Sequence, residues 1–94
     1  MSSYNDGNMA TDKEVTILSQ RKLAVGAKQL RKALHNGKAG QVFLARNADP
    51  AITEPLVALC KRCGVPVYWV GSMRELGNAC GIEVGASAAA ALKD

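Results

Sequence analysis

The chain has few of the residues on which disulfide-stabilised and secreted proteins depend. It contains three cysteines and one histidine in 94 residues, and an odd number of cysteines does not make a disulfide framework. No apolar run approaches the roughly 18 residues that a membrane-spanning helix needs. The polar N-terminus lacks the apolar core of an export signal. We therefore expect a protein of the reducing cytoplasm that does not enter a membrane.

Familiar catalytic and metal-binding patterns are also missing. The glycines form neither G-x-G-x-x-G nor a Walker A loop. Cys60 and Cys63 form a C-x-x-C at the C-terminal end of an expected helix, where the helix dipole does not lower a thiol pKa. Only Cys80 and His35 remain as further soft ligands, so a zinc site is incomplete. We expect buried or half-buried structural thiols, no cofactor, no metal and no enzymatic activity. A thiol–disulfide enzyme is an alternative that a depressed thiol pKa would support.

Positive charge is what the sequence does contain, and it is concentrated in one block. The net charge is +4, but residues 21–46 hold seven basic residues and no acidic one. A block of one sign inside a folded domain is typical of a surface that binds a polyanion, whereas solubility is served by mixed charges. The seven residues are Arg21, Lys22, Lys28, Arg31, Lys32, Lys38 and Arg46.

The pattern of apolar residues and turn signals predicts one domain over residues 13–94, after a flexible leader over residues 1–12. Helices are expected over residues 13–25, 27–35, 53–63 and 73–79, and strands over residues 41–45, 65–70 and 86–92. The alanine-rich last segment favours helix by propensity and strand by its place in the order, and we choose strand. These elements predict an α/β protein, in which helices cover both faces of a small sheet.

The segment from Gly26 to Lys32 is the first candidate binding site. A glycine permits an unusual turn, and a helix that begins directly after it would place Lys28 and Gln29 in its first turn. The N–H groups and dipole of such a turn attract phosphate or the acceptors on base edges. The alternative is a solvated amphipathic helix. The candidate residues are Gly26, Ala27, Lys28, Gln29, Arg31 and Lys32.

A second candidate is the apolar loop Ile82-Glu83-Val84, which lies between two glycines. It is either a packing turn or a surface that stacks on an unpaired base, and the sequence leaves both open. Tyr68 and Trp69 lie within an expected strand, so at least one of them should belong to the core. A stacking platform for single-stranded RNA is the alternative for the other.

Five fragments in order resemble the L-seven-Ae/L-thirty-e ribosomal protein superfamily, and especially its short bacterial, YbxF-like members. The similarity runs over about residues 13–92. The resemblance implies a three-layer α-β-α sandwich with a small mixed sheet of about four strands. It also implies binding to kink-turn RNA, an internal loop with tandem sheared G·A pairs. The fragments are Gly26-x-x-Gln29-x-x-Lys32, Val42–Ala45, Ala48–Pro50, Cys63–Pro66 and Leu76–Val84.

The resemblance also assigns roles to residues. Gly26 to Gln29 match the family's G-x-N-E segment, which meets the G·A pairs in the major groove. Here Lys28 stands in place of Asn and Gln29 in place of Glu. A glutamine carbonyl still accepts from guanine N–H groups, without charge assistance, whereas lysine only donates. Lys32 matches a lysine that reaches phosphate or a base edge, and Ile82–Val84 match the loop that packs on the extruded nucleotide.

The sequence thus predicts a monomeric, non-enzymatic RNA-binding protein that recognises kink-turns and is associated with the ribosome. Its RNA would be ribosomal RNA or a riboswitch. Arg46 and Asn47, after the expected strand at residues 41–45, complete the candidate RNA contacts. The competing hypothesis is a protein-interaction module of the same superfamily with only non-specific RNA affinity. Exposed apolar surface on the third helix or the last strand would favour it.

Overall fold

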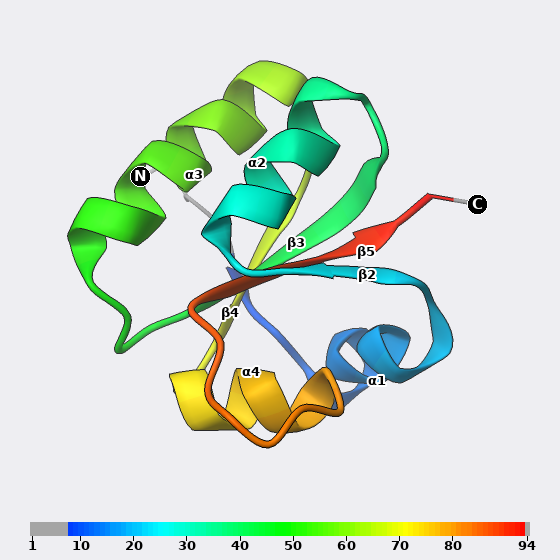
Figure 1. Ribbon diagram of the computed structural model, residues 1–94, viewed down its shortest axis with the longest axis vertical. Helices are drawn as coiled ribbons and strands as arrows, with labels where there is room; N and C mark the ends of the chain where they lie inside the picture. Colours follow the sequence, from blue (N-terminus) through cyan, green and yellow to red (C-terminus); the bar gives the residue numbers. More distant parts are fainter. Residues whose placement is uncertain (1–7, 94) are drawn as a thin grey trace.

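A computed structural model describes residues 8–93 as alternating strands and helices (Figure 1). Residues 1–7 and 94, which include most of the predicted leader, lie outside the described part. The elements are β1 (Asn8–Met9), α1 (Asp12–Gln20), β2 (Leu23–Val25), α2 (Ala27–His35), β3 (Ala39–Ala45), α3 (Pro50–Cys63), β4 (Val67–Val70), α4 (Met73–Ala79) and β5 (Ala88–Leu92).

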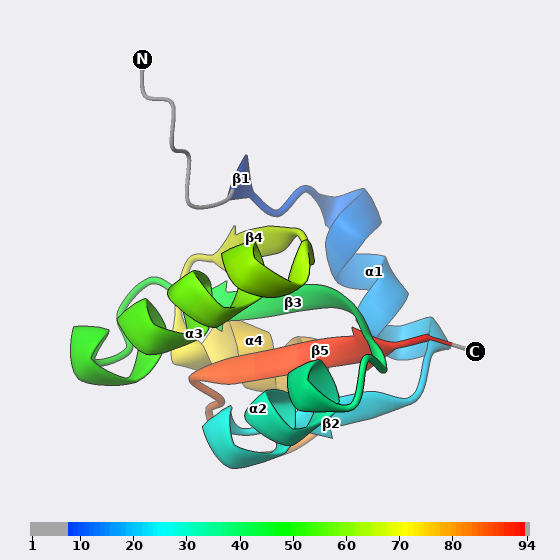
Figure 2. The same cartoon turned by 90° about the horizontal axis from the view of Figure 1, so that it is seen from above.

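The strands form one mixed sheet in the order β1-β4-β3-β5-β2. Strand β4 pairs in parallel with β1 and β3, whereas β5 runs antiparallel to both β3 and β2. Helices α2 and α3 cover one face of the sheet, and α1 and α4 cover the other (Figures 1 and 2). The predicted three-layer α-β-α sandwich is confirmed. The sheet has five strands when the two-residue β1 is included, rather than about four.

Two apolar clusters hold the layers together, and the central strand β3 contributes side chains to both of them. Val42 and Leu44 pack toward α2 and α3, while Phe43 and Ala45 pack toward α1 and α4. Successive side chains of a strand point to opposite faces, so a strand covered on both faces is apolar throughout. The neighbouring β5 is also covered on both faces and is apolar throughout, with Ala88 to Ala91 all buried. Strand was therefore the correct prediction for this segment, because pairing on both sides overrides the helix propensity of alanine.

The first expected helix is wrong at its C-terminal end. Helix α1 stops at Gln20, and Leu23–Val25 form strand β2, which pairs with β5 at the sheet edge. Arg21 adopts an extended conformation that ends the helix. Three residues are too few to show the period of a strand, so the pairing partner decides the structure here.

Other boundaries also differ from the prediction. Strands β3, β4 and β5 begin at Ala39, Val67 and Ala88 rather than at residues 41, 65 and 86. Residues 8–12, expected in the leader, provide β1 and the start of α1, which Thr11 and Glu14 close with a capping box. Helix α3 begins at Pro50 rather than near Thr53, because the Asp49 side chain accepts a hydrogen bond from the Ala51 N–H at 2.9 Å. Thr53, expected to cap the helix, is buried instead.

Candidate nucleic-acid interface

The candidate residues gather at one edge of the sheet, the one formed by the C-terminal ends of β2, β3 and β4 and by the start of β5, and the topology explains why. Strands β2, β3 and β4 run parallel to one another, and β5 runs the opposite way, so the ends of the first three lie beside the start of the fourth. Gly26 follows β2 and Arg46 follows β3, while the loop that contains Ile82–Val84 leads into β5. Figure 1 shows the N-terminus of α2 and the start of β5 close together at this edge.

Helix α2 begins without a side-chain cap, whereas α1, α3 and α4 each have one. Gly26 has φ 99° and ψ 151°, a conformation that side chains disfavour, and its N–H donates to the Ala88 carbonyl at 2.8 Å. The first intrahelical bond runs from Leu30 N–H to the Gly26 carbonyl at 2.9 Å. The N–H groups of Ala27, Lys28 and Gln29 precede it. The helix therefore presents donors and a positive dipole beside exposed Lys28 and Gln29 side chains.

The loop Gly81–Gly85 is fixed on α4 by its backbone. The Ile82 N–H donates to the Gly77 carbonyl at 3.0 Å, and the Val84 backbone passes so close to Gly77 that a Cβ there would collide with the Val84 carbonyl. Ile82 is half-buried against the α1–α4 layer, whereas Val84 is 70% exposed. Ile82 thus has the packing role, and Val84 has the exposed position that stacking on a base would require.

Arg46 and Asn47 lie at the same edge, on the β4 side. The exposed Arg46 donates its backbone N–H to the Val70 carbonyl at 2.9 Å, and its Nη1 lies 3.5 Å from the Met9 Sδ. The Asn47 side-chain oxygen accepts a hydrogen bond from the Met73 N–H at 2.8 Å. Asn47 therefore ties the end of β3 to the start of α4. Sequence reasoning missed this role, since the two residues are far apart in the chain.

The block of seven basic residues extends from the edge that holds the start of α2 to the opposite edge of the sheet. Lys28, Arg31 and Lys32 lie exposed on α2. Lys22 and Lys38 lie at the opposite edge, where their carbonyls accept from Leu92 N–H at 2.9 Å and Lys93 N–H at 2.8 Å. Lys32 and Lys38 line the same hollow, so the positive charge continues along α2 from one edge toward the other.

The cysteines differ from one another in burial. Cys60 is buried, and desolvation, with a smaller contribution from Cys63, raises the pKa of its thiol to about 12. Burial also raises the pKa of the Cys80 thiol. The expectation of burial is wrong for Cys63, which is exposed at the end of α3. Because a redox thiol needs a depressed pKa, the thiol–disulfide alternative gains no support from Cys60.

Within residues 8–93, no group of three or more histidine, cysteine, aspartate or glutamate side chains could hold a metal ion. None of the helices in this part of the chain has the length and apolar character needed to cross a membrane.

These features define a small α-β-α sandwich that presents a basic, donor-rich helix end beside an apolar loop at one sheet edge. The chain belongs to the ribosomal protein L7Ae/L30e/S12e/Gadd45 family, whose sequence profile matches residues 9–94.

Relatives within and beyond bacteria support this assignment. The RNA-binding protein YbxF of Geobacillus stearothermophilus is 43% identical over 77 residues, covering 82% of this chain and 94% of the relative. An RNA-binding protein of Halalkalibacterium halodurans is 35% identical over 91 residues, 97% and 99% of the two chains. The solved Giardia lamblia 15.5kD RNA binding protein superposes with a TM-score of 0.81 at 29% identity, covering 92% of this chain and 79% of that chain. The resemblance to YbxF-like members of the superfamily is confirmed, and the names of these relatives describe RNA-binding proteins rather than enzymes.

Proposed function

We propose that this protein binds RNA without catalysing a reaction, and that it recognises kink-turn internal loops. It acts as a monomer in the cytoplasm, associated with the ribosome, and stabilises the kinked form of its RNA. The observation that carries the proposal is the hydrogen bond from Gly26 N–H to the Ala88 carbonyl. This bond joins the start of α2 to the strand into which the Ile82–Val84 loop leads, so that one RNA can contact both. The names of its relatives support RNA as the ligand.

The side chains at this edge have different roles in RNA recognition. Gln29 can both accept from and donate to base edges, and Lys28 donates to guanine acceptors or to phosphate. Arg31 and Lys32 neutralise phosphates, which contributes affinity with no sequence information. Val84 packs on the unpaired base. Because the free RNA exchanges between extended and kinked forms, a protein that binds only the kinked form shifts the population toward it.

A gel-shift titration at two salt concentrations tests this proposal. One RNA carries an intact kink-turn, and the other has its tandem G·A pairs replaced by Watson–Crick pairs. We expect tighter binding to the intact RNA at both salt concentrations. Equal binding that higher salt abolishes would contradict motif recognition and leave only a basic surface.

The protein-interaction hypothesis required exposed apolar surface on α3 or β5. Strand β5 lies between β3 and β2 and is buried, and the large apolar side chain that α3 exposes is Ile52, at 37%. Among the described residues, Met9, Met73 and Val84 are also exposed, and of these Met73 and Val84 belong to the edge that carries the proposed RNA site. Helix α3 and strand β5 therefore lack the extensive apolar surface that the protein-interaction hypothesis requires.

A further inference from the structure

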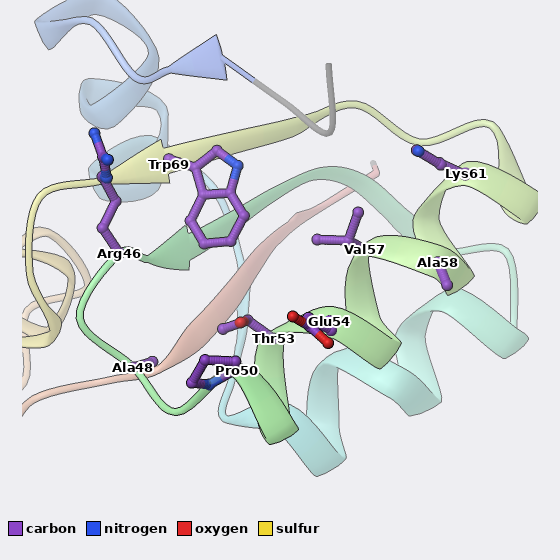
Figure 3. A pocket seen from close by; sticks show the side chains of 9 residues that line it. All are labelled: Arg46, Ala48, Pro50, Thr53, Glu54, Val57, Ala58, Lys61 and Trp69. Carbon is purple, nitrogen blue, oxygen red and sulfur yellow. The ribbon is translucent and has the colours of Figure 1, made fainter. Parts of the chain in front are cut away.

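A hollow lies on the α3 face of the sheet, beside β4, and the proposed kink-turn contacts do not use it (Figure 3). Its volume is about 480 Å³, within the range of roughly 300–1,000 Å³ that small-molecule sites occupy. Trp69 forms one wall, and Thr53, Glu54 and Val57 of α3 form the opposite one. Arg46 stands at the end of the hollow nearest the proposed RNA edge, and its guanidinium is directed away from the α3 wall, with Nη1 3.5 Å from the Met9 Sδ.

The alternation of side chains along β4 explains why Trp69 faces this hollow. Tyr68 points to the other face of the sheet, where its ring stacks on Phe43 with the centroids 5.5 Å apart. Trp69 points toward α3 and remains half-buried, at the margin of the cluster formed with α2 and α3. Within residues 8–93, the outer neighbour of β4 is the two-residue β1, and this described part of the chain leaves the indole only half-buried on that side. One aromatic side chain thus completes the core, and the other is accessible to a ligand.

The lining favours a nucleotide over other ligands of this size. An indole face provides a stacking surface that accepts any nucleobase, and the carboxylate of Glu54 can accept hydrogen bonds from base N–H groups. The guanidinium of Arg46 is suited to phosphate. A cationic ligand would also stack on an indole, but it would meet the like charge of Arg46 at one end of the hollow.

We infer that this hollow binds one unpaired nucleotide of the RNA held at the sheet edge, with its base on Trp69 and its phosphate on Arg46. The inference rests on the proposed RNA-binding function. Arg46 directly follows β3, at the same edge as Gly26 and the Ile82–Val84 loop. A single-stranded segment of RNA that extends from the bound RNA on the β4 side therefore reaches Arg46 first and then the hollow. The ligand is a single-stranded extension and not the kink-turn itself.

The fluorescence of Trp69 provides a direct test, because it is the only tryptophan in the chain. The full chain is titrated with a blunt-ended kink-turn RNA and with the same RNA carrying a short single-stranded extension. Stacking of about 1–3 kcal/mol per base corresponds to roughly 5- to 150-fold tighter binding of the extended RNA. We expect this gain in affinity together with quenching of Trp69 emission by the extended RNA only. Equal affinities, or emission that responds equally to both RNAs, would overturn the inference.

Two variants assign the gain to the hollow. Trp69→Leu should abolish the preference for the extended RNA and leave the affinity for the blunt RNA unchanged, whereas Trp69→Phe should keep part of the preference. Glu54→Gln keeps the shape of an exposed side chain, and it should weaken only the extended RNA. Arg62→Gln, an exposed change at the end of α3, is the control and should change neither affinity. If Trp69→Leu and Glu54→Gln both retain the full preference, the hollow does not bind the extension.

Other occupants would give different results. Saturable quenching by a mononucleotide, with no preference for the extended RNA, would assign the hollow to a free nucleotide and overturn its link to RNA. An indole already shielded from acrylamide in the free protein would mean that the hollow is filled, which would also overturn the inference. If the blunt RNA binds no better than its G·A-replaced form, kink-turn recognition itself fails. That result is distinct from the failure of the hollow to bind an extension.

Discussion

At the start of α2, single side chains determine which contacts the proposed RNA site would offer. Gly26 supplies the turn, and the exposed Lys28 and Gln29 supply polar groups of different capacity. Gln29 carries both a donor and an acceptor, so it can distinguish base edges, whereas a lysine mainly contributes charge. Specificity and affinity are therefore expected to depend on different residues of the same helix.

We predict that Gln29→Ala reduces the preference for an intact kink-turn over its G·A-replaced form by about 1–3 kcal/mol. Arg31→Ala, one turn further along, should weaken both RNAs about equally because it removes a phosphate contact. Competition gel shifts with both RNAs measure the two effects. A Gln29→Ala protein with full discrimination would show that α2 does not read the bases.

The cysteines permit a second prediction at this scale. Cys60 is buried with a thiol pKa raised to about 12, and Cys63 is exposed. A thiol reagent at pH 8 should therefore modify Cys63 in the native protein and reach Cys60 only after denaturant is added. Mass-spectrometric mapping of the label, with Cys63→Ser as the control, distinguishes the two sites.

The raised pKa of Cys60 also affects how the stability of the protein depends on pH. Since the folded pKa of Cys60 lies above its unfolded value, its thiol stabilises the fold below about pH 9. That contribution is lost as the pH rises toward 12.

Among the elements, the short helix α4 is what positions the apolar loop. Its N-terminus is held by Ser72 and by the Asn47 side chain, and Gly77 provides the surface on which Val84 rests. The loop is therefore set by backbone contacts with the helix, and its exposed Glu83 and Val84 side chains remain available for binding.

We predict that Gly77→Ala destabilises the protein by about 1–3 kcal/mol and weakens kink-turn binding, because a Cβ at this position collides with the Val84 backbone. Asn78→Ala, at the next and exposed position, should change both quantities little. Urea unfolding and gel shifts measure stability and binding on the same samples. Unchanged binding by a destabilised Gly77→Ala protein would show that the loop takes no part in recognition.

Elements with strong local signals could be predicted from the sequence, and those that depend on distant partners could not. Helices α2 and α4 have the predicted bounds, since a glycine precedes one and Ser72 caps the other. Strand β2 was missed because its three residues gain their structure only by pairing with β5. The link from Asn47 to α4 was missed for the same reason. The residues themselves indicated Gly26–Lys32 and Ile82–Val84 as candidates, and resemblance to the family supplied their kink-turn roles, which stay predictions for this chain.

On the scale of the whole molecule, the spread of positive charge over both sheet edges gives a prediction about salt dependence. Each phosphate contact adds about one unit to the slope of log affinity against log salt. Lys28→Gln, at the proposed RNA edge, should reduce the magnitude of that slope by about one. Lys22→Gln removes the same charge from the opposite edge and should leave it unchanged. Equal effects of the two variants would mean that net charge, and not a located site, governs binding.

The two outermost strands of the sheet are its shortest. β1 contains two residues and β2 contains three. An exposed strand edge is a template on which another chain can add a strand, and short edges offer little backbone for such addition. A sheet whose buried strands are long and whose outer strands are short has little capacity for intermolecular pairing. The same topology that gathers the candidate contacts at one end thus also protects the molecule against growth by edge-to-edge aggregation.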